Sequence, residues 1–283
     1  MQTVTSADEL HAVSRHWRQQ AQRIALVPTM GNLHAGHLQL VRHAQAIADR
    51  VVVSIFVNPM QFGPEEDYAA YPRTLEDDSR ALMDVDADLL FVPEVETMYP
   101  EDLANAPYVE VPELGKILCG KFRPGHFTGV ATVVAKLFNL VQPDIAVFGE
   151  KDYQQLVVIR RMTQALCMPV VIVGVATVRE DDGLAMSSRN RYLTPAERAT
   201  AAQLYQLLCG IKSDIEAGAT DYRAIEQAAM STLQQAGFRP DYASLRRASD
   251  LAEAGPGDSE LRLLVAAWLG QARLIDNLSI SIS

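Results

Sequence analysis

The 283-residue sequence lacks several features that would assign a protein to a class at once. Its three cysteines, Cys119, Cys167 and Cys209, have no paired or metal-binding spacing, which argues against a disulfide framework and predicts a reducing, cytoplasmic location. No apolar run reaches the roughly 20 residues that span a bilayer, and no secretory signal opens the chain, so we expect no membrane association. Lys and Arg total 25 against 35 Asp and Glu, and this net charge of -10 argues against nucleic-acid partners.

Two common nucleotide-binding motifs are also missing. The sequence has no Gly-x-Gly-x-x-Gly fingerprint of a dinucleotide site. Residues 115–122 match the spacing of a P-loop, but Phe122 stands where Ser or Thr would bind Mg²⁺. We interpret this near-match as a coincidence in a loop.

What is present is an alternation of apolar, β-branched runs with segments of helical periodicity. The runs predict buried parallel strands at 24–27, 51–57, 89–92, 145–148 and 170–175, and the segments between them predict helices at 36–49, 74–84, 129–140 and 153–166. This order indicates an α/β fold with a doubly wound parallel sheet in a domain of residues 1–175. Residues 108–111 form an edge strand or an irregular excursion, and an edge strand would offer a surface for pairing subunits.

The pattern changes after about residue 176, where we expect a smaller α+β domain of residues 176–283. Thr194, Pro195 and Glu197 form a helix-start signal, and the helix should run to about residue 217. A second helix at 221–236 and strands at 241–247, 261–268 and 272–280 follow.

Residues 28–37, PTMGNLHAGH, end the first predicted strand and open a helix with two histidines three residues apart. The unpaired N-H groups and the dipole at a helix start attract anions, and His34 and His37 would add donors for a polyphosphate. Gly31 and Gly36 let phosphate approach the backbone. The alternatives are a glycine turn with two solvated histidines and a zinc site, for which two ligands are too few.

Polar residues follow two other predicted strands. Asn58 and Gln61 follow the second strand, where a carboxamide suits a ligand with hydroxyl and carboxylate groups, although Asn58 also fits a simple turn before proline. Lys151, in the segment 149–155, suits a phosphate, Asp152 a helix cap, and Gln155 the same site as Gln61.

Three further clusters have both a functional and an ordinary structural interpretation. Arg123 and His126 form either an anion clamp or part of a surface loop. The segment ending in Ser187, Ser188 and Arg189 is either a flexible polyphosphate grip that closes over substrate or a hydrated linker. Asp77 and Asp78 are magnesium candidates, but acids in a first helical turn commonly interact only with the helix dipole.

Taken together, the chain resembles the pantothenate synthetase (pantoate–β-alanine ligase) family of the HxGH nucleotidyltransferase-like superfamily. The resemblance covers nearly the whole chain. It rests on six motifs in the family's order: residues 28–31 with His34 and His37, then 56–62, 71–74, 123–127, 148–152 and 186–189.

This resemblance implies a Rossmann-like fold, a cytoplasmic homodimer, and an ATP- and Mg²⁺-dependent reaction in two steps. Pantoate would attack the α-phosphorus of ATP, and β-alanine would then displace AMP from pantoyl adenylate. It also implies the residue roles. Catalysis would involve His34, His37, Lys151 and Arg189, with His37 the acid that eases departure of pyrophosphate. ATP would contact Met30, Gly31, Asn32, Leu33, His34, Ala35, Gly36, His37, Gly149, Glu150, Lys151, Asp152, Val178, Met186, Ser187, Ser188 and Arg189. Pantoate would contact Thr29, Met30, Asn58, Gln61 and Gln155, and β-alanine would contact Gln61.

Two other functions remain open at this point. A nucleotidylyltransferase of the same superfamily would keep its nucleotidylated product, although such enzymes are generally shorter and lack a comparable second domain. A catalytically silent nucleotide-binding module would bind ATP without exchanging pyrophosphate.

Overall fold

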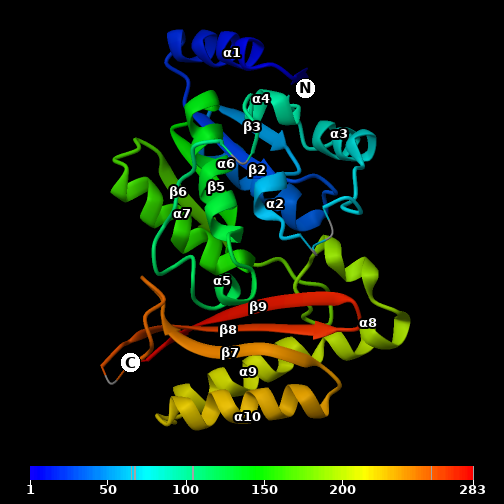
Figure 1. Ribbon diagram of the computed structural model, residues 1–283, viewed down its shortest axis with the longest axis vertical. Coiled ribbons are helices and arrows are strands. Elements are labelled where there is room, and N and C mark those ends of the chain that lie inside the picture. The colour runs from blue at the N-terminus through cyan, green and yellow to red at the C-terminus, as the bar shows by residue number, and fades with distance from the viewer. Residues whose placement is uncertain (65, 67, 104, 256, 283) are drawn as a thin grey trace. The chain divides into compact units, whose positions relative to one another are not determined.

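The computed structural model describes residues 1–64, 66, 68–103, 105–255 and 257–282 (Figure 1). Its backbone contacts divide the chain into two compact units. The first unit comprises residues 1–150 and 158–176, and the second comprises residues 151–157 and 177–283. Residues 151–157 end a 3-10 turn and begin the helix of residues 153–165, and they belong with the C-terminal unit, which no local sequence pattern indicates. Within the described ranges, no helix is both long and apolar enough to cross a membrane.

The first unit contains a six-stranded, wholly parallel sheet in the order β1-β4-β3-β2-β5-β6. The strand order reverses between β2 and β5, where ligands bind in open α/β sheets. The doubly wound α/β class predicted from the sequence is thus confirmed. The strands are β1 (Gln2–Val4), β2 (Ile24–Thr29), β3 (Arg50–Ile55), β4 (Leu89–Phe91), β5 (Ile145–Gly149) and β6 (Val171–Val175).

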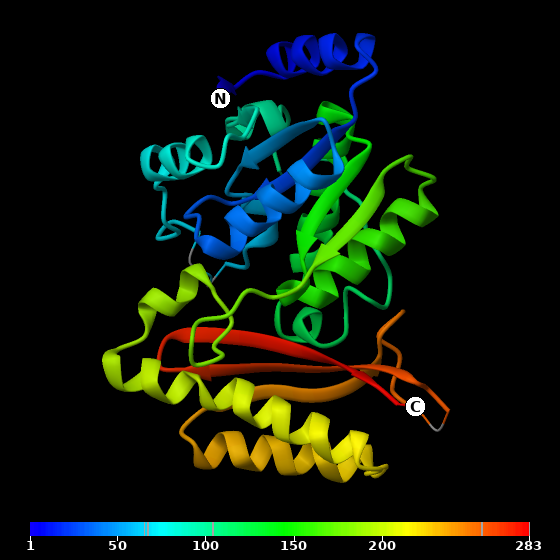
Figure 2. The same cartoon turned by 180° about the vertical axis from the view of Figure 1, so that it is seen from behind.

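Helices cover this sheet on both faces. Ala25 and Val27 of β2 belong to one apolar cluster with Val41 of α2 and Leu82 of α3. Ile24 and Leu26 alternate to the opposite face and are also fully buried. Figure 2 shows α2 running along the sheet. The helical elements are α1 (Ala7–Gln19), α2 (Ala35–Ile47), η1 (Pro59–Gln61), α3 (Leu75–Met83), α4 (Val95–Met98), α5 (Cys119–Phe122), α6 (His126–Val141), η2 (Glu150–Asp152) and α7 (Tyr153–Ala165).

Residues 108–111 are the excursion and not the edge strand. The Val109 N-H donates to the Thr132 hydroxyl of α6 at 2.9 Å, so it is not available to a strand ladder. The N-terminal β1 and α1 add to the predicted elements, and α1 begins with a capping box between Ser6 and Glu9.

The second unit is an antiparallel sheet with two helices packed along one face (Figures 1 and 2). Leu204, Leu208, Ile211 and Ile215 of α9 recur at helical spacing and pack on the sheet. Its elements are η3 (Ser188–Tyr192), α8 (Pro195–Ala201), α9 (Gln203–Glu216), α10 (Tyr222–Gln235), β7 (Arg239–Arg247), β8 (Glu260–Leu269) and β9 (Ala272–Ser281).

The single long helix predicted after Thr194 is wrong in one respect. The capping box of Thr194 and Glu197 is present, but the helix is interrupted at Ala202. The Thr200 hydroxyl donates to the Ala196 carbonyl at 3.2 Å, and such bonds to the preceding turn bend helices.

Candidate active site

The loop after β2 turns sharply into α2. Thr29 Oγ1 donates to the Ser54 carbonyl at 2.8 Å and accepts from the Gly31 N-H at 3.2 Å. Gly31 and Asn32 both have positive φ, 78° and 51°. A Cβ at Gly31 would lie 3.0 Å from both Asp78 Oδ2 and Ile55 Cγ2, so this position requires glycine for its conformation and for space.

Asp78 holds this loop from α3. Its buried carboxylate accepts from the Asn32 N-H at 2.9 Å, the Leu33 N-H at 2.7 Å and the Thr74 hydroxyl at 3.1 Å. Asp77 is exposed and pairs with Arg80 at 2.9 Å. The geometry therefore does not fit the predicted magnesium role, because the Asp78 oxygens already accept backbone hydrogens and Asp77 lies on the outer surface. Among the residues described, no three His, Cys, Asp or Glu side chains gather as a metal site.

His34 and His37 lie at the start of α2, as predicted, and their rings are 4.1 Å apart. His34 is the N-cap, and its Nδ1 accepts from the Gly36 N-H at 3.1 Å. His37 Nδ1 accepts from the His34 N-H at 3.3 Å. Since each Nδ1 is an acceptor, the proton of each neutral imidazole is assigned to Nε2. The pair thus forms a reciprocal cap that presents two Nε2-H donors at a helix N-terminus.

Gln61 lies beside Met30, with Gln61 Nε2 at 3.2 Å from Met30 Sδ. Asn58 Nδ2 donates to Gln61 Oε1 at 3.1 Å, which orients the Gln61 amide nitrogen toward Met30. Of the residues predicted to hold pantoate, the first unit therefore brings Met30, Asn58 and Gln61 together.

All hydrogen-bonding positions of the Asn58 side chain are occupied within the protein. Its Nδ2 also donates to the Gly129 carbonyl at 3.1 Å, and its Oδ1 accepts from the Met60 N-H and the Tyr99 hydroxyl, at 3.3 and 2.7 Å. A carboxamide has two donors and two acceptor positions, so all four are occupied. The structure makes Asn58 a support for Gln61 and not, as the resemblance implied, a contact to pantoate. Burial raises the pKa of Tyr99, which keeps its hydroxyl a donor.

Arg123 and His126 also support Gln61. Arg123 makes two hydrogen bonds to the Glu66 carboxylate, at 2.7 and 2.5 Å, and lies 3.0 Å from His126 Nε2. His126 Nδ1 lies 2.8 Å from the Gln61 carbonyl, so it is the donor there. Burial favours a higher pKa of Glu66, but the Arg123 guanidinium holds that pKa below its usual range. Arg123 and His126, the predicted anion clamp, therefore interact with the Glu66 carboxylate and the Gln61 backbone of this chain.

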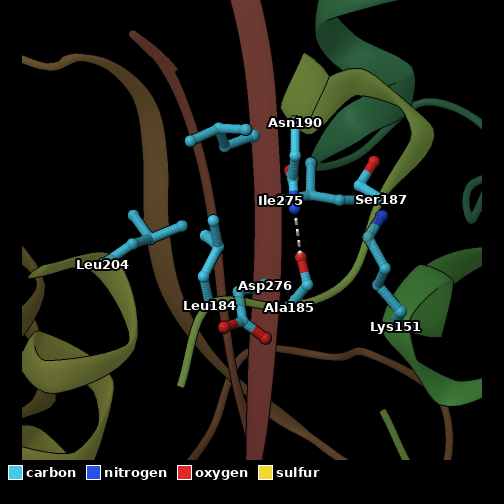
Figure 3. A pocket seen from close by; sticks show the side chains of 9 residues that line it. Lys151, Leu184, Ala185, Ser187, Asn190, Leu204, Ile275 and Asp276 are labelled. Atoms are coloured by element: carbon cyan, nitrogen blue, oxygen red, sulfur yellow. Dashed lines mark hydrogen bonds between the residues drawn. The ribbon is translucent and has the colours of Figure 1, made fainter. Parts of the chain in front are cut away.

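Gly149 and Glu150, at the end of β5 and the start of η2, belong to the first unit, and the second unit carries Lys151 and the predicted residues that follow it. Lys151, Ser187 and Asn190 line a small pocket of about 10 Å³ together with Asp276, which is room for about one water molecule. Figure 3 shows the Lys151 side chain extending toward Ser187. The other lining residues are Leu184, Ala185, Leu204, Leu274 and Ile275.

The segment 178–189 is folded as a hairpin and a helical turn. The Met186 N-H donates to the Val178 carbonyl at 3.0 Å, and Asn190 Nδ2 donates to the Ala185 carbonyl at 3.0 Å. Ser187 Oγ accepts from the Arg189 N-H at 3.3 Å and caps η3. Gln155, on α7, also belongs to the second unit.

A sequence model described as pantoate-beta-alanine ligase matches residues 2–279. The chain belongs to the pantoate-beta-alanine ligase family. It is similar to pantothenate synthetases from Methylococcus capsulatus (56% identical, covering 100% of this chain and 99% of the relative) and Idiomarina loihiensis (57%, covering 94% and 95%).

Solved structures of the pantoate-beta-alanine ligase family share the fold. The pantothenate synthetase of Thermus thermophilus is 47% identical with a TM-score of 0.91, covering 98% of this chain and 99% of its own. A Francisella tularensis ligase, complexed with β,γ-ATP and β-alanine, is 33% identical with a TM-score of 0.83, covering 98% and 97%. The family inferred from six motifs is thus confirmed.

Sequence reasoning missed the residues that position this machinery. Asp78 was predicted as a magnesium candidate and not as a support for the loop, because the backbone N-H groups that it accepts from lie 45 and 46 residues away. Asn277 of β9, whose Nδ2 donates to the Lys151 carbonyl at 2.9 Å, lies 126 residues from its partner and in no recognised motif.

Proposed function

We propose that this chain joins pantoate to β-alanine in an ATP-dependent, AMP-forming reaction. A pantoate carboxylate oxygen attacks the α-phosphorus of ATP and pyrophosphate leaves. The β-alanine amine then attacks the acyl carbon of pantoyl adenylate, AMP leaves, and the amide of pantothenate forms. The match of the ligase family to residues 2–279 supports the reaction class. The reciprocal cap of His34 and His37 is the observation that carries the chemistry.

The cap supplies donors that are already oriented. Two Nε2-H groups at the N-terminus of α2 suit the polyphosphate, where negative charge shifts as pyrophosphate departs. Because Nδ1 of each ring accepts a backbone hydrogen, neither imidazole can rotate without losing that bond. We assign His37 to the leaving pyrophosphate and His34 to the same chain of phosphates.

Gln61 provides the site for the organic acid. Its amide is oriented by Asn58 and its carbonyl by His126, so the side chain is held before substrate arrives. We assign pantoate to Gln61, Thr29, Met30 and Gln155, and β-alanine to Gln61.

Lys151 and Arg189 supply positive charge to the same polyphosphate in this proposal. The other residues that we assign to ATP here are Gly149, Glu150, Asp152, Val178, Met186, Ser187 and Ser188. Mg²⁺ enters with ATP on its phosphates, since Asp77 and Asp78 do not form a shared site.

We also propose that the enzyme is a cytoplasmic homodimer. Cys119, Cys167 and Cys209 form no disulfide with one another, which supports a reducing compartment. The dimer rests on the family resemblance alone, and sedimentation of the purified protein tests it.

One assay separates this function from its rivals: exchange of labelled pyrophosphate into ATP, with pantoate and β-alanine each present or absent. We expect exchange to require pantoate but not β-alanine, and AMP and pantothenate to form in equal amounts once β-alanine is added. A nucleotidylyltransferase would accumulate an adenylated product in the presence of β-alanine. A silent module would bind ATP with no exchange, and either result would overturn the proposal.

A further inference from the structure

We propose that Asp276 and Asn277, neighbours on β9, are positioning residues that hold the Lys151 backbone and the hairpin leading to Ser187, Ser188 and Arg189. This inference rests on the proposed function, which assigns Lys151 and Arg189 to ATP. All of these residues belong to the second unit.

Asn277 holds Lys151 through the backbone. Its Oδ1 accepts from Arg262 Nε at 2.6 Å, and its Nδ2 donates to the Lys151 carbonyl at 2.9 Å. The Arg262 bond assigns the amide orientation, because a guanidinium can only donate. Arg262 in turn stacks on the Tyr153 ring, 3.9 Å from its centroid, two residues after Lys151.

Asp276 holds the hairpin. Its side chain is 1% exposed and accepts from both terminal nitrogens of Arg179, at 2.7 and 3.0 Å. Arg179 also donates to the Gly183 carbonyl at 3.0 Å, stacks on Tyr205, and forms a β-bridge with Ala185. The base of the hairpin is thereby fixed to β9 two residues before Ser187.

The Asn277 contact to Lys151 and the Asp276 contact to Arg179, which we call the two tethers, hold segments whose residues line the same pocket. Lys151, Ser187 and Asp276 line the same pocket, and Figure 3 shows the Lys151 side chain directed toward Ser187. The Asp276 charge is paired with Arg179, so it does not compete with a phosphate for the Lys151 ammonium.

Contacts of this kind contribute more to the positions of the groups they join than to the free energy of unfolding. A buried ion pair adds little stability over apolar residues of similar size, but it specifies one arrangement of the groups it joins. Lysine carries its charge on a flexible stem, so the backbone carbonyl held by Asn277 determines which positions that charge can reach. A misplacement of about 1 Å can lower a rate about a hundredfold.

A double-mutant cycle tests the Asn277 tether through pantoate-dependent pyrophosphate exchange. We expect Asn277→Ala to lower the exchange rate about tenfold or more in the wild-type background, but less than about threefold when Lys151→Ala is already present, because the tether acts through that lysine. Ser279→Ala, an exposed position on the same strand, is the control and should remain within about twofold of wild type. Losses that multiply independently, or an Asn277→Ala rate equal to the control, would overturn the proposal.

Asn277→Asp provides a second variant if Asn277→Ala does not fold. It keeps an acceptor for Arg262 but sets an oxygen against the Lys151 carbonyl, so the same cycle and the same criterion apply. Asp276→Asn, combined with Arg189→Ala, tests the hairpin tether in the same way.

ATP affinity measured by calorimetry separates this inference from the proposed function. If wild-type protein binds ATP but shows no pantoate-dependent exchange, the proposed function fails. The tether is then judged on affinity, where Asn277→Ala should weaken ATP binding only while Lys151 is present.

Discussion

The Asp78 carboxylate accepts a hydrogen bond from the Leu33 N-H at 2.7 Å, one residue before His34. The same carboxylate accepts from the Asn32 N-H, whose residue has positive φ. A buried side chain on α3 therefore determines the path by which the backbone enters the paired histidines.

Replacing Asp78 should damage both the fold and the first half-reaction. Asp78→Asn leaves one acceptor oxygen and adds a donor facing the Asn32 or Leu33 N-H, so we expect a loss of about 1.5–3 kcal/mol in unfolding free energy. The KM for ATP should rise, because the helix start shifts. Urea denaturation and pyrophosphate exchange measure the two effects. Asp77→Asn, one residue away and exposed, should cost under about 1 kcal/mol and leave exchange unchanged.

His37 accepts the His34 N-H and, in our proposal, donates to the leaving pyrophosphate, and substitutions can separate these two roles. His37→Ala should raise the barrier to pyrophosphate exchange by about 2–4 kcal/mol, because a preorganised donor to the shifting phosphate charge is lost. His37→Asn keeps an acceptor for the His34 N-H without the reach of Nε2, so it should retain thermal stability but not activity. Near-normal exchange by a folded His37→Ala protein would contradict the role assigned here.

Replacing Gln61 should weaken the binding of pantoate and leave the binding of ATP unchanged. Gln61→Ala removes the oriented amide, so we expect the KM for pantoate to rise at least about tenfold, as expected when one good hydrogen bond is lost, while ATP affinity stays within about twofold. Initial-rate kinetics with each substrate varied in turn measures the split. A matched rise in the KM for ATP would show that Gln61 does not discriminate between the two sites.

Asn58→Ala should also raise the KM for pantoate, because it removes the hydrogen bond that orients the Gln61 amide. It leaves the buried Tyr99 hydroxyl and the Gly129 carbonyl without their Asn58 partner, which should lower stability by about 1–3 kcal/mol for each buried group left unsatisfied. Thermal unfolding and the KM for pantoate are the measurements. An unchanged unfolding temperature would refute the supporting role.

The Glu66 ion pair should make stability depend on acidity. The pKa of Glu66 is lowered from 4.5 in the folded protein, so its contribution is present above pH 4.5 and is lost as pH falls through the lower folded value. Glu66→Gln should therefore be less stable than wild type by about 1–3 kcal/mol at neutral pH, and the difference should vanish in acid. Denaturation from pH 7 to pH 3 tests this, with exposed Glu76→Gln as the control. A difference that persists at the lowest pH would mean that packing, and not charge, is responsible.

Local sequence determined the features that depend on residues within one turn or one strand. The parallel strands follow from apolar runs such as residues 24–27, and His34, Ser187 and Thr194 cap their helices through contacts with the next two or three residues. These interactions need no other part of the chain. The combination of six motifs was likewise enough to identify the ligase family.

Tertiary structure alone decided which polar residues support others. Asn58 was predicted to touch substrate and instead orients Gln61, Arg123 pairs with Glu66, and Asn277 reaches Lys151 across 126 residues. The sequence shows the same asparagine or arginine whether the side chain contacts a ligand or a buried carbonyl. Only the fold brings its partner within hydrogen-bond distance, because these bonds join residues that are distant in sequence and come together after the sheets have packed.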